Sequence, residues 1–219
     1  MKYNGQNLED KIIWEYFQEN YGTEFKGNVL DLGANDGVFL SNSRLFLENG
    51  WKGILLEASQ KVFKQLNNNY INTNYNYSLI ECAISTKNEF VTFYESSSLI
   101  SGDDYGLVST IVPSELSRWN NKNIKFKTYQ VECKTFDTIF GKGNEYGLSD
   151  DIVLDFISID VEGMDYQILT QIDLTKYGCK CLCVEFNGIE KEKYVDYANK
   201  HGMMLYHQNG ENLIFTLKK

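Results

Sequence analysis

The stretch NVLDLGANDGVFLSNS, residues 28–43, combines a short apolar segment, a glycine-spaced turn and the start of a helical pattern. Asp31 lies near the end of the apolar segment, and Gly33 and Gly37 bracket the turn. A second apolar segment, GILLEA, follows after one helix length and contains Glu57. This order is typical of an open α/β sheet that binds a nucleoside. The glycines let the backbone approach the ligand, and the second acid accepts hydrogen bonds from ribose hydroxyls.

The turn differs from the dinucleotide-binding pattern in both spacing and charge. That pattern is Gly-x-Gly-x-x-Gly, and its backbone N–H groups hold a pyrophosphate. Here Asp31 precedes the first glycine and Asp36 lies inside the turn, so a phosphate would be repelled. S-adenosylmethionine fits this environment, because it carries a ribose, an ammonium and a sulfonium group and no phosphate. The alternative is a strand–turn–helix unit that binds no ligand, since glycine-rich turns are common.

Composition indicates a single folded domain. The 219 residues are 42% hydrophobic and carry a net charge of −9, which makes nucleic acid an unfavourable partner. No apolar run approaches the roughly 20 residues of a membrane span, and the N-terminus lacks the apolar core of a signal peptide, so we expect a cytoplasmic protein.

The five cysteines lie in apolar segments and are expected to be buried and reduced. Three of them alternate in YGCKCLCVEF, which predicts that they share one strand face.

Hydrophobic periodicity predicts alternating strands and helices, and therefore a mostly parallel sheet. Strands are expected over 28–32, 53–57, 77–85, 89–96, 126–135, 153–160 and 179–188. Helices are expected over 6–22, 41–48, 60–69, 164–172 and 190–202. The ending MMLYHQNGENLIFTL predicts an antiparallel hairpin around its Asn-Gly pair. The polar segment 96–125 is interpreted as a lid or insert over the substrate, with disorder as the alternative.

Acids and an amide follow two of the predicted strands. Asp160 and Glu162 come after the strand in FISIDVEG, and Glu185 and Asn187 end the strand in CVEFNG. Ligands of open α/β sheets bind at the carboxyl ends of the strands, so these side chains should converge with Asp31 and Glu57. The alternative is that each acid only caps the helix that follows it.

Five segments in this order resemble FkbM-type methyltransferases, which use S-adenosylmethionine to methylate oxygen. They are QNLEDKIIW, DLGANDGVFLSNS, GWKGILLEA, FISIDVEGMDYQIL and CVEFNG. The resemblance covers nearly the whole chain. It implies one class I methyltransferase domain over residues 1–219, built on a Rossmann-like seven-stranded sheet that is mostly parallel and ends in an antiparallel hairpin. Ser158 and Asp165 stand where the family often has Lys and Glu.

The resemblance also implies where the cofactor lies. Residues assigned by position to the methionine end are Asp31, Gly33, Asn35, Asp36 and Gly37. Glu57 would bind the ribose, Cys82 and Ala83 would lie near the adenine, and Asp160 would face the methyl group. Asn42 and Ala58 complete the expected cofactor-binding set.

The expected reaction is methyl transfer to a hydroxyl of a sugar, glycan or small metabolite, and a homodimer is compatible with the sequence. Two routes would assist loss of the hydroxyl proton. The first is a general base, for which Asp160, Glu162, Asp10 and His207 are candidates. The second is Mg²⁺ held by Asp160, Glu185 and Asn187. Asp10, Asn42, Trp119 and His207 are expected on the acceptor side.

Two functions of other classes remain alternatives at this point. One is a non-catalytic module that keeps the nucleoside pocket. The other is a nicotinamide-dependent oxidoreductase, which the missing third glycine and the terminal hairpin disfavour.

Overall fold

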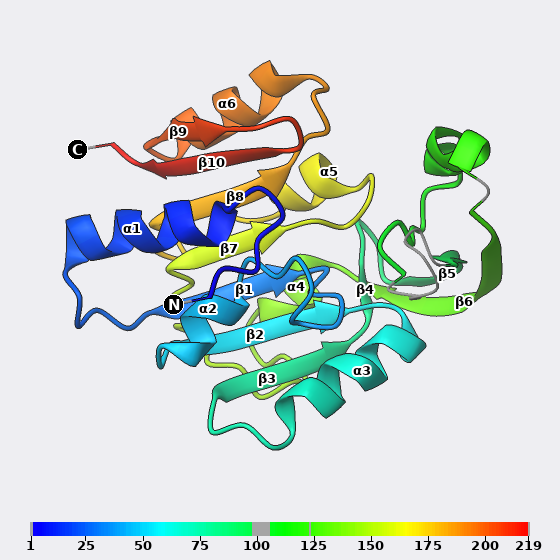
Figure 1. Ribbon diagram of the computed structural model, residues 1–219, viewed down its shortest axis with the longest axis horizontal. Coiled ribbons are helices and arrows are strands. Elements are labelled where there is room, and N and C mark those ends of the chain that lie inside the picture. Colours follow the sequence, from blue (N-terminus) through cyan, green and yellow to red (C-terminus); the bar gives the residue numbers. More distant parts are fainter. Residues whose placement is uncertain (1, 98–105, 123, 219) are drawn as a thin grey trace.

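The computed structural model describes residues 2–97, 106–122 and 124–218. A seven-stranded sheet in the order β3-β2-β1-β7-β8-β10-β9 forms its centre (Figure 1). Neighbouring strands from β3 to β8 are parallel, whereas β10 is antiparallel to both β8 and β9. The predicted Rossmann-like methyltransferase sheet with its C-terminal hairpin is thereby confirmed. The strands are β1 (Asn28–Leu32), β2 (Lys52–Glu57), β3 (Asn76–Glu81), β7 (Phe156–Ile159), β8 (Cys181–Glu185), β9 (Met203–Gln208) and β10 (Asn212–Leu217).

Helices cover both faces of this sheet because the strand residues alternate between two apolar clusters. Val29 of β1 packs in one cluster, with residues of α1 (Glu9–Tyr21), α2 (Arg44–Glu48) and α3 (Gln60–Tyr70). Leu30 and Leu32 pack in the other, with residues of α4 (Phe136–Phe140), α5 (Asp165–Leu169) and α6 (Lys191–Lys200). This two-sided burial explains why β1 and β8 read as nearly continuous apolar runs.

All five cysteines are free and buried, as expected. The prediction that three of them share a strand face is wrong for one. Cys181 and Cys183 of β8 pack in the same cluster as α1, whereas Cys179 packs in the opposite cluster. Cys179 precedes β8, so the alternation of the strand does not extend to it.

The strand predicted over 77–85 is divided at Cys82. Its first part is β3, whose pairing with β2 ends where Glu81 meets Glu57. Its second part is β4 (Ala83–Ile84), which pairs with β6 (Phe126–Lys134) in a separate three-stranded sheet that includes β5 (Glu89–Ser96). Figure 1 shows this smaller sheet beside the carboxyl ends of the main strands. The division places Cys82 between the two sheets.

Other predicted elements exist but are shorter than expected. The strand predicted over 153–160 is limited to β7, and the helix predicted over 164–172 to α5. The helix predicted over 41–48 begins at Arg44, whose N–H donates to the Ser41 hydroxyl at 3.0 Å. That side-chain bond replaces the first helical turn.

Part of the predicted lid or insert over 96–125 lies outside the described residues, which omit 98–105 and 123. In the described part, Tyr94 and Thr110 form a β-bridge, and η1 (Pro113–Lys122) is a 3₁₀ helix. The Thr110 hydroxyl donates to the Glu162 carbonyl at 2.6 Å. This segment therefore packs on the loop that follows β7, and its role as a lid stays a prediction. Among the described helices, none has the length and apolar character needed to cross a bilayer.

Candidate active site

A cavity of about 520 Å³ lies at the carboxyl ends of the parallel strands. Twelve of the residues predicted for the cofactor, the general base and the metal line it, and they come from five strand ends and the loops that follow. They are Asp31, Gly33, Asn35, Asn42, Glu57, Ala58, Cys82, Ala83, Asp160, Glu162, Glu185 and Asn187. The expected convergence of strand-end acids on one edge of the sheet is present, in agreement with the placement of ligands in open α/β folds.

Gly33 occupies a position where a side chain does not fit. Its φ is +87°, and a Cβ atom there would lie 1.8 Å from the Asp160 carbonyl oxygen. Its N–H and that of Ala34 donate to the Leu56 carbonyl, at 3.1 and 2.8 Å. The turn after β1 is thus held between the ends of β2 and β7, which brings the first acid-bearing loop next to Asp160.

Asp36 and Gly37 do not line the cavity, in contrast to the sequence expectation. One Asp36 carboxylate oxygen accepts the N–H groups of Val38 and Phe39, both at 2.8 Å. Gly37 packs so closely on α3 that a Cβ would lie 2.5 Å from the Tyr70 ring. Both residues therefore stabilise the turn and lie away from the cavity. An acid that closes a turn has the same local sequence signature as an acid that binds a ligand.

The SNS tripeptide after the turn fixes Asp31 and reaches β7. The Ser43 hydroxyl donates to the Asp31 carboxylate at 2.5 Å. The Asn42 amide lies 3.4 Å from the Ser158 hydroxyl, while its own Oδ1 is buried without a partner. Burial raises the pKa of Asp31 to about 6, although the hydrogen bond from Ser43 opposes the shift. The sequence assigned no role in the site to Ser43 or Ser158, because a serine near an acid is not distinctive.

Glu57 is oriented by two backbone donors. One of its oxygens accepts the Ser59 N–H at 2.7 Å and the other accepts the Asn35 N–H at 3.0 Å. The residue is 8% exposed, and burial raises its pKa to about 7. The carboxylate is therefore fixed at the end of β2, where it can accept further hydrogen bonds from a ligand.

The wall beyond Glu57 is apolar and comes from both sheets. Cys82 and Ala83 are buried there, and Phe93 of β5 and Val108 face the same cavity. The stretch 106–111, which sequence reasoning did not assign to the cofactor, contributes part of this wall. No local motif marks it, because its position depends on pairing within the smaller sheet.

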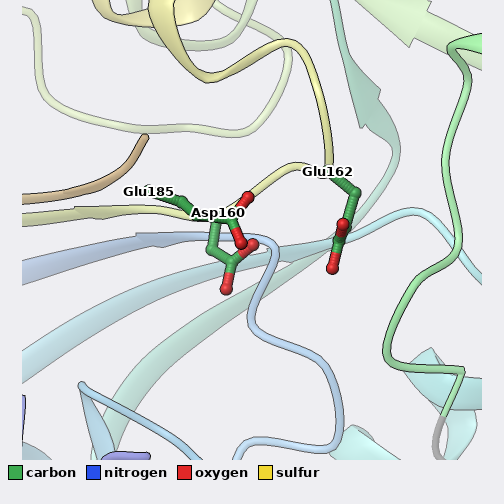
Figure 2. A group of neighbouring side chains, drawn as sticks. All are labelled: Asp160, Glu162 and Glu185. Carbon is green, nitrogen blue, oxygen red and sulfur yellow. The ribbon is translucent and has the colours of Figure 1, made fainter. Parts of the chain in front are cut away.

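The carboxylates of Asp160, Glu162 and Glu185 lie close together at the end of the cavity away from the apolar wall. Figure 2 shows Asp160 and Glu185 beside each other, with Glu162 on the loop that follows β7. Each offers an oxygen, and these oxygens lie within 4.8 Å of one another. Burial, followed by repulsion from the neighbouring carboxylates, raises the pKa of each of the three. One oxygen of Glu185 is buried and has no hydrogen-bond partner.

Of the other residues predicted for the acceptor side, one lies in the cavity and two lie outside its lining. Trp119 of η1 also lines the cavity. His207 lies on the edge strand β9, opposite Ile214 of β10, and does not line it. Asp10 accepts the N–H groups of Asn4 and Lys11, at 2.6 and 2.8 Å, and also lies outside the cavity lining.

A family model described as the methyltransferase FkbM domain matches residues 31–210, from the acid of β1 to the terminal hairpin. The chain belongs to the FkbM methyltransferase family. Its membership confirms the resemblance noted in the sequence and implies S-adenosylmethionine as the methyl donor. A search of curated proteins gave no significant match.

The cavity of this FkbM methyltransferase suits such a donor in size and charge. Its volume lies within the range of roughly 300–1,000 Å³ that is usual for small-molecule sites. Among the described residues that line it, seven carry carboxylates and one, Arg118, carries a positive charge. A ligand with a sulfonium and an ammonium group is favoured in such a field, and a dinucleotide with its pyrophosphate is disfavoured.

Proposed function

We propose that this FkbM methyltransferase methylates a hydroxyl oxygen of a sugar, glycan or other small metabolite. The observation that carries the proposal is one continuous cavity with two chemically different ends. At one end Glu57 is held by two backbone donors, and at the other Asp160, Glu162 and Glu185 face one another. S-adenosylmethionine supplies an activated methyl group when bound.

The nucleoside end would be formed by Glu57 and the apolar wall. Both Glu57 oxygens already accept backbone N–H groups, and a carboxylate has further lone pairs for two ribose hydroxyls. Cys82 and Ala83 give an apolar surface of the kind that an adenine ring requires. Asp31 and Asn35 would face the methionine end, where Asp31 favours the positive groups.

The acceptor would enter from the side of η1. A second cavity of about 230 Å³ adjoins the first and shares Arg118, Glu185 and Asn187 with it. Carboxylate and amide groups dominate this junction, which suits a ligand rich in hydroxyl donors. The acceptor would occupy this adjoining cavity, beside the acids and next to the nucleoside.

The acids would receive the acceptor proton. A sugar hydroxyl is a very weak acid, so its oxygen attacks slowly unless a base takes the proton as the new C–O bond forms. Burial and mutual repulsion raise the pKa values of Asp160 and Glu162 toward the range in which a carboxylate is a useful base. We assign the general base to this pair when no cation is bound there.

A labelled-methyl assay tests the proposal. The protein is incubated with S-adenosylmethionine carrying a deuterated methyl group and a panel of saccharides and natural-product alcohols, and the products are analysed by mass spectrometry. We expect a mass increase of one labelled methyl on a hydroxyl oxygen. Transfer to nitrogen or carbon would refute O-methylation. Binding of S-adenosylhomocysteine without turnover on any acceptor would favour a non-catalytic nucleoside-binding module.

A further inference from the structure

The acid cluster differs from the buried carboxylates elsewhere in this protein in having few hydrogen-bond partners. Glu9 is fully buried but accepts hydrogen bonds from the side chains of Asn209 and Asn212, at 2.7 and 2.9 Å. Asp165 is 5% exposed and accepts the N–H groups of Val161 and Gly163, at 2.8 and 3.1 Å. These two acids are satisfied by the fold, as buried polar groups usually are.

Glu185 is the exception. It is 8% exposed at the end of β8, and its Oε2 is buried without a hydrogen-bond partner. Leaving such an atom unpaired destabilises the protein, and more so when the group is charged. A buried, unpaired carboxylate oxygen that faces a cavity calls for a partner from the cavity, such as an ion, a water molecule or a ligand.

Nearby side-chain cations do not supply that partner. Arg118, the one cationic residue among the described residues of the main cavity, donates to Glu115 at 2.6 Å. Lys193, which lines the adjoining cavity, donates to Glu190. The charge of Arg118 opposes the rise in the pKa of Glu162 and Glu185, but burial and the neighbouring acids outweigh it, and neither cation forms a hydrogen bond to the three acids in the described part of the chain.

The distances within the cluster suit a small cation. An ion such as Mg²⁺ lies about 2.1 Å from each oxygen ligand, so opposite ligands are about 4 Å apart. The oxygens of Asp160, Glu162 and Glu185 lie within 4.8 Å of one another, and β7 and β8 are paired neighbours that hold two of the acids in place (Figure 2).

We propose that Asp160, Glu162 and Glu185 bind one hard divalent cation of the Mg²⁺ and Mn²⁺ class. Binding of the cation does not depend on the methyl-transfer reaction, but its use does rest on the proposed function. A hydroxyl that contacts such an ion loses its proton more readily, which would place the ion at the acceptor end of the cavity. Glu162 replaces Asn187 in the ligand set expected from the sequence.

Mn²⁺ binding to protein stripped with EDTA tests this site directly. Free Mn²⁺ is measured by electron paramagnetic resonance during a titration at neutral pH, and Mg²⁺ competition is measured in the same samples. We expect one saturable site per chain. Even the loss of an outer partner of a metal ligand commonly costs about 10–100-fold in affinity, so Glu185→Gln and Asp160→Asn should each weaken Mn²⁺ binding at least tenfold.

The matched control is Glu81→Gln, which removes the same charge from an exposed strand end outside the cavity. It should bind Mn²⁺ like the wild type. Absence of a saturable site in the wild type, or equal affinity in all variants, would overturn the proposal and show that the acids hold protons instead. Calorimetry with S-adenosylhomocysteine on the same samples separates the cation site from the proposed function. If S-adenosylhomocysteine binds but no cation site is found, the cation proposal fails and the proposed function stands.

Discussion

The Ser43 hydroxyl donates a 2.5 Å hydrogen bond to the Asp31 carboxylate, which joins the residue before α2 to β1. Ser43 is fully buried and Asp31 is 4% exposed. We expect Ser43→Ala to lower the free energy of unfolding by about 1–3 kcal/mol, because it leaves a buried acceptor without this partner. Urea denaturation measures the change. Ser78→Ala, at an exposed position of β3, should leave stability nearly unchanged, and equal effects of the two variants would contradict this role.

Gly33→Ala should disrupt both the fold and the site. Its positive φ alone costs on the order of 1 kcal/mol, and the Cβ clash with the Asp160 carbonyl adds to that cost. Gly143→Ala separates the two effects, because Gly143 has φ +72° but open space around it. Thermal melts and S-adenosylhomocysteine calorimetry should show a larger loss of stability for Gly33→Ala, with donor binding lost. Retained donor affinity in that variant would count against the turn as part of the site.

Donor affinity should depend on pH through Glu57. Burial raises the pKa of Glu57 to about 7 in the free protein, and the charged form is the stronger acceptor for ribose hydroxyls. Donor binding therefore releases a proton below that pKa, and affinity for S-adenosylhomocysteine should be about tenfold weaker at pH 6 than at pH 8. Calorimetry at both values measures the ratio.

Glu57→Gln provides the control for that pH series. The amide does not titrate, so the ratio between the two pH values should approach one, while any contribution from the ligand's own groups remains. A variant with the same pH dependence as the wild type would assign the effect to another group.

The hydrogen bond between Thr110 and the Glu162 carbonyl should stabilise the part of the cavity wall formed by residues 106–111. The buried Thr110 hydroxyl bonds the Glu162 carbonyl, and the neighbouring residues 106–111 line the cavity. Thr110→Val removes the bond at nearly constant shape, so we expect faster amide hydrogen exchange over 106–112 and severalfold weaker donor binding. Thr128→Val, at an exposed position of β6, is the control. Unchanged exchange in Thr110→Val would argue against a covering role for this segment.

The parts of the site that follow from local sequence could be predicted. Glu57 and Asp160 each come directly at or after an apolar strand, and parallel strands bring their carboxyl ends to the same edge. Asp36 could not be separated from a ligand-binding acid, since its role is to close a turn. The segment 106–111 could not be found, because long-range pairing with β5 places it.

His207 shows how sheet order limits such predictions. Its position near an Asn-Gly turn suggests that it approaches the strand ends. The order β8-β10-β9 instead puts β10 between His207 and Glu185. A hairpin predicted from sequence does not reveal which of its two strands joins the parallel sheet.

Calorimetric titration of S-adenosylhomocysteine into the wild-type protein and Glu57→Gln tests the central claim most directly. The cavity at the ends of β1, β2 and β7 should bind one molecule per chain, at least tenfold more weakly in the variant, and NAD⁺ should give no heat of binding. Failure of S-adenosylhomocysteine to bind, or binding of NAD⁺ in its place, would contradict the assignment of this cavity to a sulfonium nucleoside.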